Sequence, residues 1–249
     1  KNETSSFLIY MVYGKEGVFL KTKIKFMAAA ALLISLVLLC QSAGKVLREE
    51  IQEGRAVSSE TGSAVVLLDP GHGGMDAGKT GVNGAEEKEI NLKIALYIKK
   101  LLEKENIDVV MTRTEDQRLA ETQVEDLKER VRIMNKANPV LAVSIHQNSY
   151  HEGGVHGAQV FYYGDSAEGK EAGEIMQRLL NENIPDNRKE AKANRSYYIL
   201  KKTEVPVIIV ECGFLSNYEE AQKLADEKYQ QTMADVIKEG ILSYIQRTG

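Results

Sequence analysis

Short apolar runs alternate with segments of helical period along most of this chain, and this alternation constrains the fold more than any other feature. The runs at 64–68, 107–111, 140–145, 158–163 and 205–211 have the length and composition of buried strands. Segments 86–105, 124–138, 167–182 and 228–246 place apolar side chains on one helical face. Strands that alternate with helices predict a single layered α/β domain with a mostly parallel sheet flanked by helices.

The beginning of the chain carries a different signal. Residues 26–40 form an almost unbroken apolar run, preceded by Lys21, Lys23 and Lys25. Positive charge followed by such a run is typical of a secretory signal peptide or signal anchor. We therefore expect residues 1–44 to be an N-terminal extension with this signal, 45–62 a polar linker and 63–249 the folded α/β domain. The predicted location is extracytoplasmic, either membrane-anchored through the N-terminal segment or secreted, with a monomeric folded domain.

Composition narrows the chemistry. The net charge of −4 gives no electrostatic case for nucleic-acid binding. The two cysteines, Cys40 and Cys212, cannot form a disulfide framework and lack the spacing of a cysteine zinc site. A metal site in this chain must therefore use histidines and carboxylates.

Three reactive side chains fall at the predicted carboxyl ends of strands. His72 follows the first strand in a glycine-rich loop, His146 ends the third strand and Glu211 ends the last one. Working residues of open α/β sheets gather at this edge. Two imidazoles and a carboxylate suit Zn²⁺, with a fourth position left for water.

The carboxylate ligand is open at this point, because Asp76, Glu86 and Glu87 all lie near the glycine-rich loop. Glu87 stands at the start of a predicted helix and can point back toward His72. A further carboxylate is needed as general base and acid, and Glu211 fits this role because desolvation at the end of an apolar strand would raise its pKa.

Each of these assignments has a structural alternative. A single histidine at a strand end is more often a hydrogen-bonded scaffold residue than a ligand. Glu211 could instead form a buried salt bridge with Arg113 or Arg130. His151 and His156, in one glycine-containing loop, are predicted to lie on the surface or to contact substrate.

In combination, the motifs resemble the N-acetylmuramoyl-L-alanine amidases of the Amidase_3 family over about residues 64–247. The matching segments, in chain order, are DPGHGGMDAG at 69–78, Glu87-Lys88, Thr112-Arg113, SIHQN at 144–148, Gly157-Ala158 and ECGFLSN at 211–217. Any one of these would be weak evidence, but their order along the chain is highly specific.

The resemblance implies a zinc hydrolase with a six-stranded sheet and one Zn²⁺ per chain, held by His72, Glu87 and His146. It implies that Glu211 is the catalytic acid and base, and Asn148 and Arg113 are candidate substrate contacts. The implied reaction is hydrolysis of the amide between N-acetylmuramic acid and L-alanine in peptidoglycan.

The size of the loops refines the expected type. The loops at 115–124 and 150–157 are too short for the helix that some division amidases insert over the zinc. The short build therefore resembles amidases that act on spore cortex before muramic-δ-lactam formation, and an activator protein is a candidate partner. Two alternatives stay open: a zinc peptidase that cuts within the stem peptide, and a domain that binds peptidoglycan or a partner without catalysis.

Overall fold

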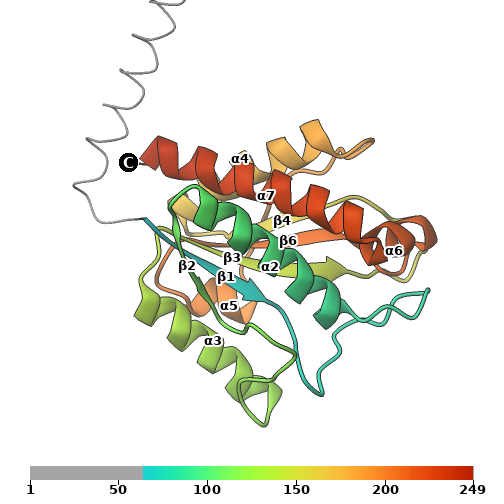
Figure 1. The fold of residues 1–249 in the computed structure, drawn as a ribbon, viewed down its shortest axis with the longest axis horizontal. Coiled ribbons are helices and arrows are strands. Elements are labelled where there is room, and N and C mark those ends of the chain that lie inside the picture. Colours follow the sequence, from blue (N-terminus) through green and yellow to red (C-terminus); the bar gives the residue numbers. More distant parts are fainter. Residues whose placement is uncertain (1–63, 249) are drawn as a thin grey trace, which may run out of the picture. The chain divides into compact units, whose positions relative to one another are not determined.

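The structure is a computed structural model that describes residues 64–248. Six strands form one sheet in the order β2-β1-β3-β6-β4-β5 (Figure 1). Strands β2, β1, β3 and β6 are parallel, β4 runs antiparallel to β6, and β5 is parallel to β4. The predicted α/β domain with a mostly parallel six-stranded sheet is confirmed. The strands are β1 Val65–Pro70, β2 Asp108–Met111, β3 Leu141–Asn148, β4 Gln159–Tyr163, β5 Lys192–Asn194 and β6 Val207–Phe214.

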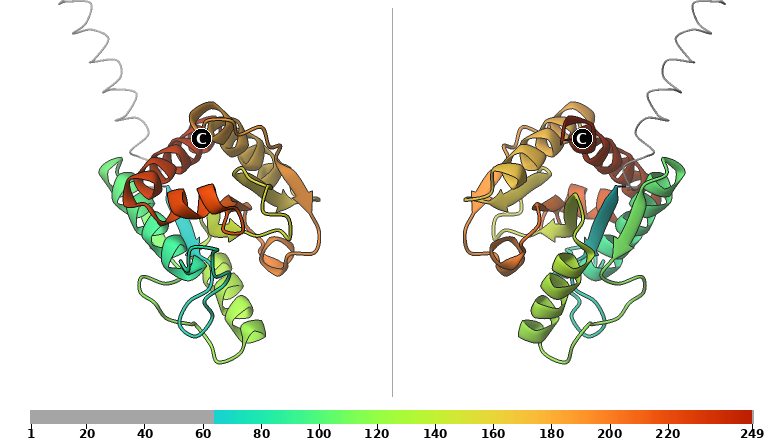
Figure 2. Two further views of the ribbon diagram at one scale, coloured as in Figure 1. Left: turned by 90° about the vertical axis from the view of Figure 1, so that its right-hand side faces the viewer. Right: turned by 90° about the vertical axis from the view of Figure 1, so that its left-hand side faces the viewer.

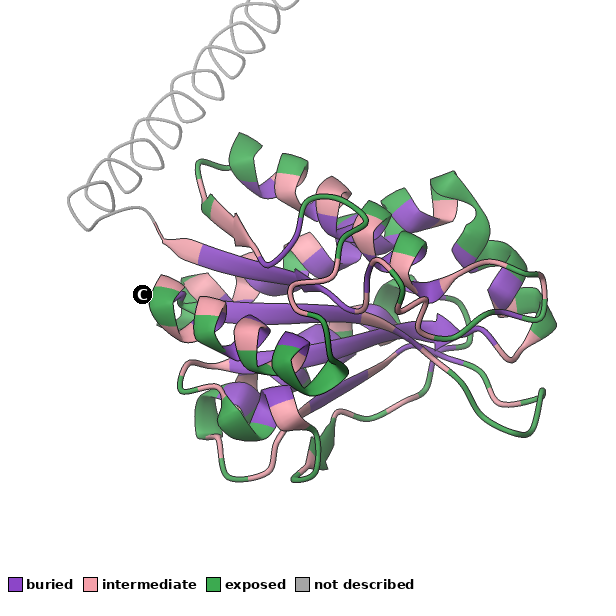
Figure 3. Cartoon of the chain, turned by 90° about the horizontal axis from the view of Figure 1, so that it is seen from below, coloured by how far each residue is buried: buried purple, intermediate pink, exposed green. Residues whose placement is uncertain are grey.

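Helices cover both faces of the sheet (Figures 1 and 2). Side chains alternate between the two faces along a strand, so Val66 and Leu68 join one apolar cluster while Leu67 joins the other. The first cluster is closed by α2 Glu87–Lys104, α4 Ala167–Asn183, α6 Tyr218–Ala225 and α7 Glu227–Thr248. The second is closed by α3 Gln123–Ala137 and α5 Tyr198–Lys202. The strands are therefore mostly buried between two helical layers, as Figure 3 shows.

Two predicted strand ends need correction. β3 continues to Asn148 and β6 to Phe214, so His146 and Glu211 lie inside strands rather than at their last residues. Pairing between these strands persists because a register shift after the His146–Glu211 pair aligns Asn148 with Phe214. Such irregularities are frequent beside active sites, where they redirect side chains.

Three short elements were not predicted. β5 has three residues, α5 has five and α6 has eight, too few to display a clear hydrophobic period. Neither the loop that precedes α3 nor residues 150–157 contains a helix, as the sequence predicts.

The predicted extension and apolar segment at 1–44 and the linker at 45–62 lie outside the described residues. Within residues 64–248, no helix combines the length and apolarity needed to cross a bilayer.

Candidate metal centre

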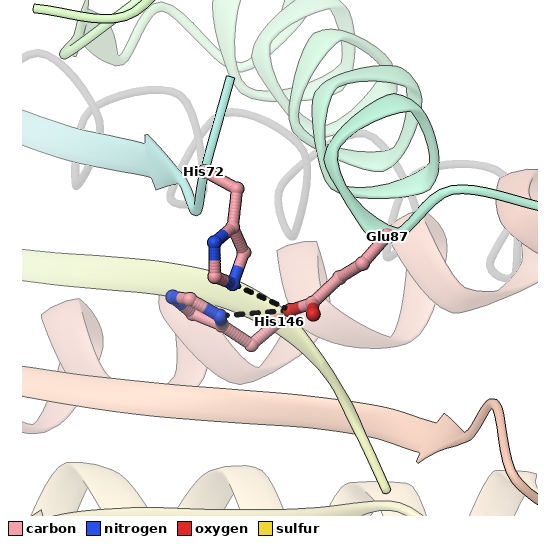
Figure 4. A group of neighbouring side chains, drawn as sticks. All are labelled: His72, Glu87 and His146. Atoms are coloured by element: carbon pink, nitrogen blue, oxygen red, sulfur yellow. Dashed lines mark hydrogen bonds and ion pairs between the residues drawn. The ribbon is translucent and has the colours of Figure 1, made fainter. Parts of the chain in front are cut away.

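Three side chains from separate elements converge at the carboxyl edge of the sheet: His72 from the loop after β1, Glu87 from the first turn of α2 and His146 from β3 (Figure 4). Glu87 Oε1 lies 3.3 Å from His72 Nε2 and 2.9 Å from His146 Nδ1. The two imidazole rings meet edge to face, with centroids 5.1 Å apart. One ligand atom from each residue lies within 4.8 Å of the other two. The structure thus brings together the three residues expected to hold a metal.

His72 is oriented by a second carboxylate. Its backbone is left-handed, with φ 62°, a conformation that a residue with a Cβ rarely adopts. Its Nδ1 lies 3.0 Å from Asp76 Oδ2, which leaves Nε2 facing Glu87. Ligating histidines in metal sites are commonly oriented by a carboxylate in this way. Asp76, one of the competing ligand candidates, therefore supports His72 and lies outside the three-residue group.

Glu87 is fixed by hydrogen bonds from the backbone. It is 4 % exposed; its Oε1 accepts from the N–H of Gln147 at 3.1 Å and its Oε2 from that of Lys79 at 2.8 Å. Burial alone would raise the pKa of Glu87, but the hydrogen bonds and charges of His146 and His72 outweigh it and lower the pKa. Glu87 is therefore an ionised carboxylate ready to bind a cation.

The two carboxylates beside His72 favour the protonated form of its imidazole. Burial would lower the pKa of this imidazole, but the carboxylates of Glu87 and Asp76 raise it to about 9. Without a metal, a proton on His72 offsets these two carboxylates. A divalent ion with nitrogen and oxygen ligands fits the same place, and metal binding would release that proton.

Glu211 approaches this group from the neighbouring strand. It pairs with His146 across the β3–β6 ladder, and its Oε2 is buried without a hydrogen-bond partner. Burial is the main cause that raises the pKa of Glu211 to about 7. An unpartnered, desolvated carboxylate beside a candidate metal site is the arrangement expected of a general base.

The salt-bridge alternative for Glu211 is not observed. Arg130 pairs instead with Asp69 at 2.7 Å and Asp126 at 2.6 Å. Arg113 donates to the backbone carbonyls of Pro70, Gly71, Lys88 and Glu115.

The candidate substrate contacts differ in accessibility. Arg113 is 1 % exposed and holds the glycine-rich loop through hydrogen bonds to its backbone carbonyls, so in this structure it acts as a scaffold residue. Asn148 is partly exposed at the end of β3, where its Oδ1 accepts from the N–H of Ser149. His151 and His156 are exposed, as predicted, and lie outside the three-residue group.

Sequence reasoning missed Asn91, which is fully buried one helical turn after Glu87. Its amide donates to the carbonyl of Gly71 at 3.2 Å and lies 3.4 Å from Glu87 Oε1, while its Oδ1 accepts from Gln147. The available signal was an amide between Ile90 and Ile94 on a helix face that is otherwise apolar.

The layered α/β fold and the candidate histidine–glutamate–histidine metal centre are together typical of a metal-dependent hydrolase. A family model described as N-acetylmuramoyl-L-alanine amidase, Amidase_3, matches residues 66–243, and the chain belongs to this family. It is accordingly a peptidoglycan amidase.

Relatives support this placement. The germination-specific N-acetylmuramoyl-L-alanine amidase of Bacillus subtilis is 35% identical over 193 residues, which cover 74% of this chain and 81% of that protein. The CwlD amidase of Clostridioides difficile, solved in complex with the GerS lipoprotein, is 35% identical with a TM-score of 0.71, covering 74% of this chain and 99% of that one. The AmiC2 amidase of Nostoc punctiforme gives 35% identity and a TM-score of 0.67, covering 74% of this chain and 99% of that one.

Proposed function

We propose that this protein hydrolyses the amide between N-acetylmuramic acid and L-alanine, using one zinc ion held by His72, Glu87 and His146, with Glu211 as proton carrier. The observation that carries the proposal is the unpartnered carboxylate of Glu211 beside the three-residue group. A zinc ion bound by three such ligands supplies Lewis-acid polarisation of a carbonyl and lowers the pKa of water.

The described residues supply the remaining steps. Glu211 accepts a proton from the attacking water as the new C–O bond forms at the scissile carbonyl. It then donates this proton to the alanine nitrogen as the C–N bond breaks. A pKa of about 7 suits both transfers near neutral pH, because the group can lose and regain a proton at little cost. The products are a muramic carboxylate and a stem peptide with a free amino group.

Two matched substitutions separate ligand from proton carrier. Glu211→Gln keeps the shape of the side chain but removes the proton acceptor, so turnover should fall by about 10²–10⁴-fold with zinc content unchanged. Glu87→Gln should lose zinc as well as activity, because an amide is a poorer ligand than a carboxylate. Zinc is measured by plasma emission and turnover by mass spectrometry of digested muropeptides. Equal zinc loss in both variants would make Glu211 a ligand and overturn the division of roles.

The same digests distinguish the alternative activities. An amidase releases intact stems, a peptidase shortens them, and a domain that only binds peptidoglycan leaves the muropeptides unchanged.

We further propose that the substrate is spore-cortex peptidoglycan and that the protein acts outside the cytoplasm. The germination-specific relative supports the cortex assignment, and the apolar run at 26–40 supports export, with or without a retained membrane anchor. The relative solved with a lipoprotein supports an activator partner for this chain too. Cortex from a deletion strain should lack muramic-δ-lactam; normal lactam content would reject the cortex role.

A further inference from the structure

A cavity of about 280 Å³ lies apart from the three-residue metal group. It is formed by residues 154–157, which lead into β4, and by residues 186–189, which follow α4. Arg188, Lys189 and His156 line it, and Asp186 is the one acidic residue among the lining residues. We refer to this cavity as the cationic pocket.

The basic side chains of the cationic pocket are available for a ligand. None of Arg188, Lys189 and His156 forms an ion pair with another residue in the range 64–248. Arg188 donates to the carbonyl of Asn187, and Lys189 Nζ lies 5.5 Å from the ring centroid of Phe214. The pocket's lining side chains therefore carry two permanent positive charges and one negative charge, and the Glu220 carboxylate at its edge accepts from the N–H groups of Gly157 and Phe214.

The residues that form the wall of the pocket are closely packed. Asn187 is 1 % exposed and donates to the carbonyl of Ala158 and to Asn181 Oδ1, while its own buried Oδ1 has no partner. A Cβ on Gly157, whose φ is 101°, would lie 2.7 Å from Asn187 Oδ1 and 3.2 Å from Lys189 Cε. The absence of a side chain at Gly157 lets the stem of Lys189 lie against the backbone at the edge of the pocket.

The pocket lies within reach of the proton carrier. Gln159, two residues after Gly157, pairs with Glu211 across the β4–β6 ladder. Phe214, which Lys189 overlies, follows Glu211 on β6 across the register shift and pairs with Asn148, two residues after His146, so it lies about 7 Å beyond Glu211 at the usual rise per residue. β4 flanks β6 on the side opposite β3, so the pocket and His146 lie on opposite sides of Glu211.

We propose that the cationic pocket binds a free carboxylate of the stem peptide, on the amine side of the scissile bond. The inference rests on the proposed amidase function and adds a determinant of substrate choice. The sugars of the glycan are neutral and the muramic carboxyl is consumed in the amide, so the stem supplies the negative charge. Two extended residues span about 7 Å, which matches the separation along β6 between Glu211 and Phe214, the residue that Lys189 overlies.

The test compares two muramoyl peptides that differ only in whether the carboxylate of the second stem residue is free or amidated. The unmodified protein should show a lower KM for the free acid. Arg188→Met combined with Lys189→Met should raise that KM about tenfold, the loss expected for a charge-assisted hydrogen bond. The KM for the amidated peptide, kcat, zinc content and Tm should stay unchanged. Lys192→Met is the matched control, because it removes an exposed positive charge on β5 outside the pocket.

The outcomes separate this inference from the proposed function. If the unmodified protein cleaves both peptides with equal KM, or if the double variant keeps its preference for the free acid, the carboxylate pocket is wrong and the amidase function stands. If the protein releases intact stems from neither peptide, the proposed function fails first. An equal rise in KM for Lys192→Met would assign the effect to overall surface charge and reject the pocket.

Discussion

The two histidines of the candidate metal centre reach it by different routes. His146 belongs to β3, which is paired with β1 on one side and with β6 on the other. His72 belongs to a loop and holds a left-handed backbone conformation. The carbonyl of His72 accepts from Arg130 Nη2 at 2.7 Å, and the carbonyls just before it accept from Arg130 and Arg113.

A metal-ligating side chain on a strand is positioned by the hydrogen bonds between strands. One on a loop needs additional hydrogen bonds that hold the loop backbone. Here the support is a buried ion-pair network in which Asp69 and Asp126 hold Arg130. Asp69 is fully buried and also accepts from the hydroxyls of Thr112 and Ser144. The network lies beneath the loop, so its integrity should affect His72 more than His146.

The largest effect is expected from Arg130→Gln. The substitution leaves Asp69 buried without its charged partner and frees the loop carbonyls, so the free energy of unfolding should fall by about 3–5 kcal/mol. Urea unfolding followed by circular dichroism measures the change. Arg132→Gln is the control, since Arg132 lies on the same helix but forms an exposed pair with Glu129; its midpoint should not move. Equal small effects in both variants would show that the loop does not depend on the network.

The elements that carry the two histidines could be predicted from the sequence because their apolar residues have a regular spacing. β1, β3 and α2 lie within a few residues of their predicted bounds. The grouping of His72, Glu87 and His146 came from the family motifs, which alone singled out Glu87; the structure brings the three side chains together, and their binding of zinc stays a prediction. The role of Arg130 could not, because its partners Asp69 and Asp126 are distant in sequence or show no pattern. The scaffold role of Arg113 has the same cause, since burial of an arginine depends on which carbonyls the fold brings to it.

Substitutions of glycines beside the two imidazoles test the position of His146 on its strand and that of His72 on its loop separately. A Cβ on Gly71 would lie 2.2 Å from the ring of His146, and one on Gly78 would lie 2.6 Å from His72 Cδ2 and from Glu87 Oε2. Gly71→Ala and Gly78→Ala should each cost about 1–3 kcal/mol of stability through overpacking and reduce zinc content. Gly78→Ala should cost more, because its φ of 66° adds backbone strain.

Gly84→Ala is the control for strain alone. Gly84 has a φ of 83°, but a Cβ added there would meet no atom within 4 Å. Zinc content should therefore be unchanged while stability falls by about 1 kcal/mol. Normal zinc content in Gly71→Ala would show that the strand-borne histidine adapts more easily than the comparison implies.

Asp76→Ala should act on His72 without a large effect on the fold. Removing the carboxylate that orients Nδ1 should weaken zinc affinity by about 10–100-fold. Competition with a fluorescent chelator measures it. Asp116→Ala is matched, because Asp116 binds Gly74 and Lys88 near the same loop but neither imidazole. An equal loss in both variants would mean that loop stability, and not imidazole orientation, sets the affinity.

Ser144→Ala, with a smaller expected effect than Arg130→Gln, tests how far β3 contributes to the support of the loop. Ser144 is buried and its hydroxyl donates to Asp69 Oδ2 at 2.7 Å. Burial would raise the pKa of Asp69, but Arg130 and the hydroxyls of Ser144 and Thr112 outweigh it and lower the pKa below 3.8. A folded-state pKa below the unfolded value means that this stabilisation is complete above about pH 4–5 and is lost as pH falls through the folded pKa.

Ser144→Ala should therefore cost about 1.5 kcal/mol at pH 7, since the hydrogen bond it removes is made to a charged group. The difference from the unmodified protein should shrink on acidification, because a protonated Asp69 gains less from the hydroxyl. Urea unfolding at several values between pH 7 and pH 3 measures this, with Ser149→Ala, an exposed residue just after β3, as the control. A cost that stays constant with pH would mean that Ser144 contributes through packing alone. In that case the network beneath His72 is independent of the strand that carries His146, and the contrast between the two routes becomes sharper.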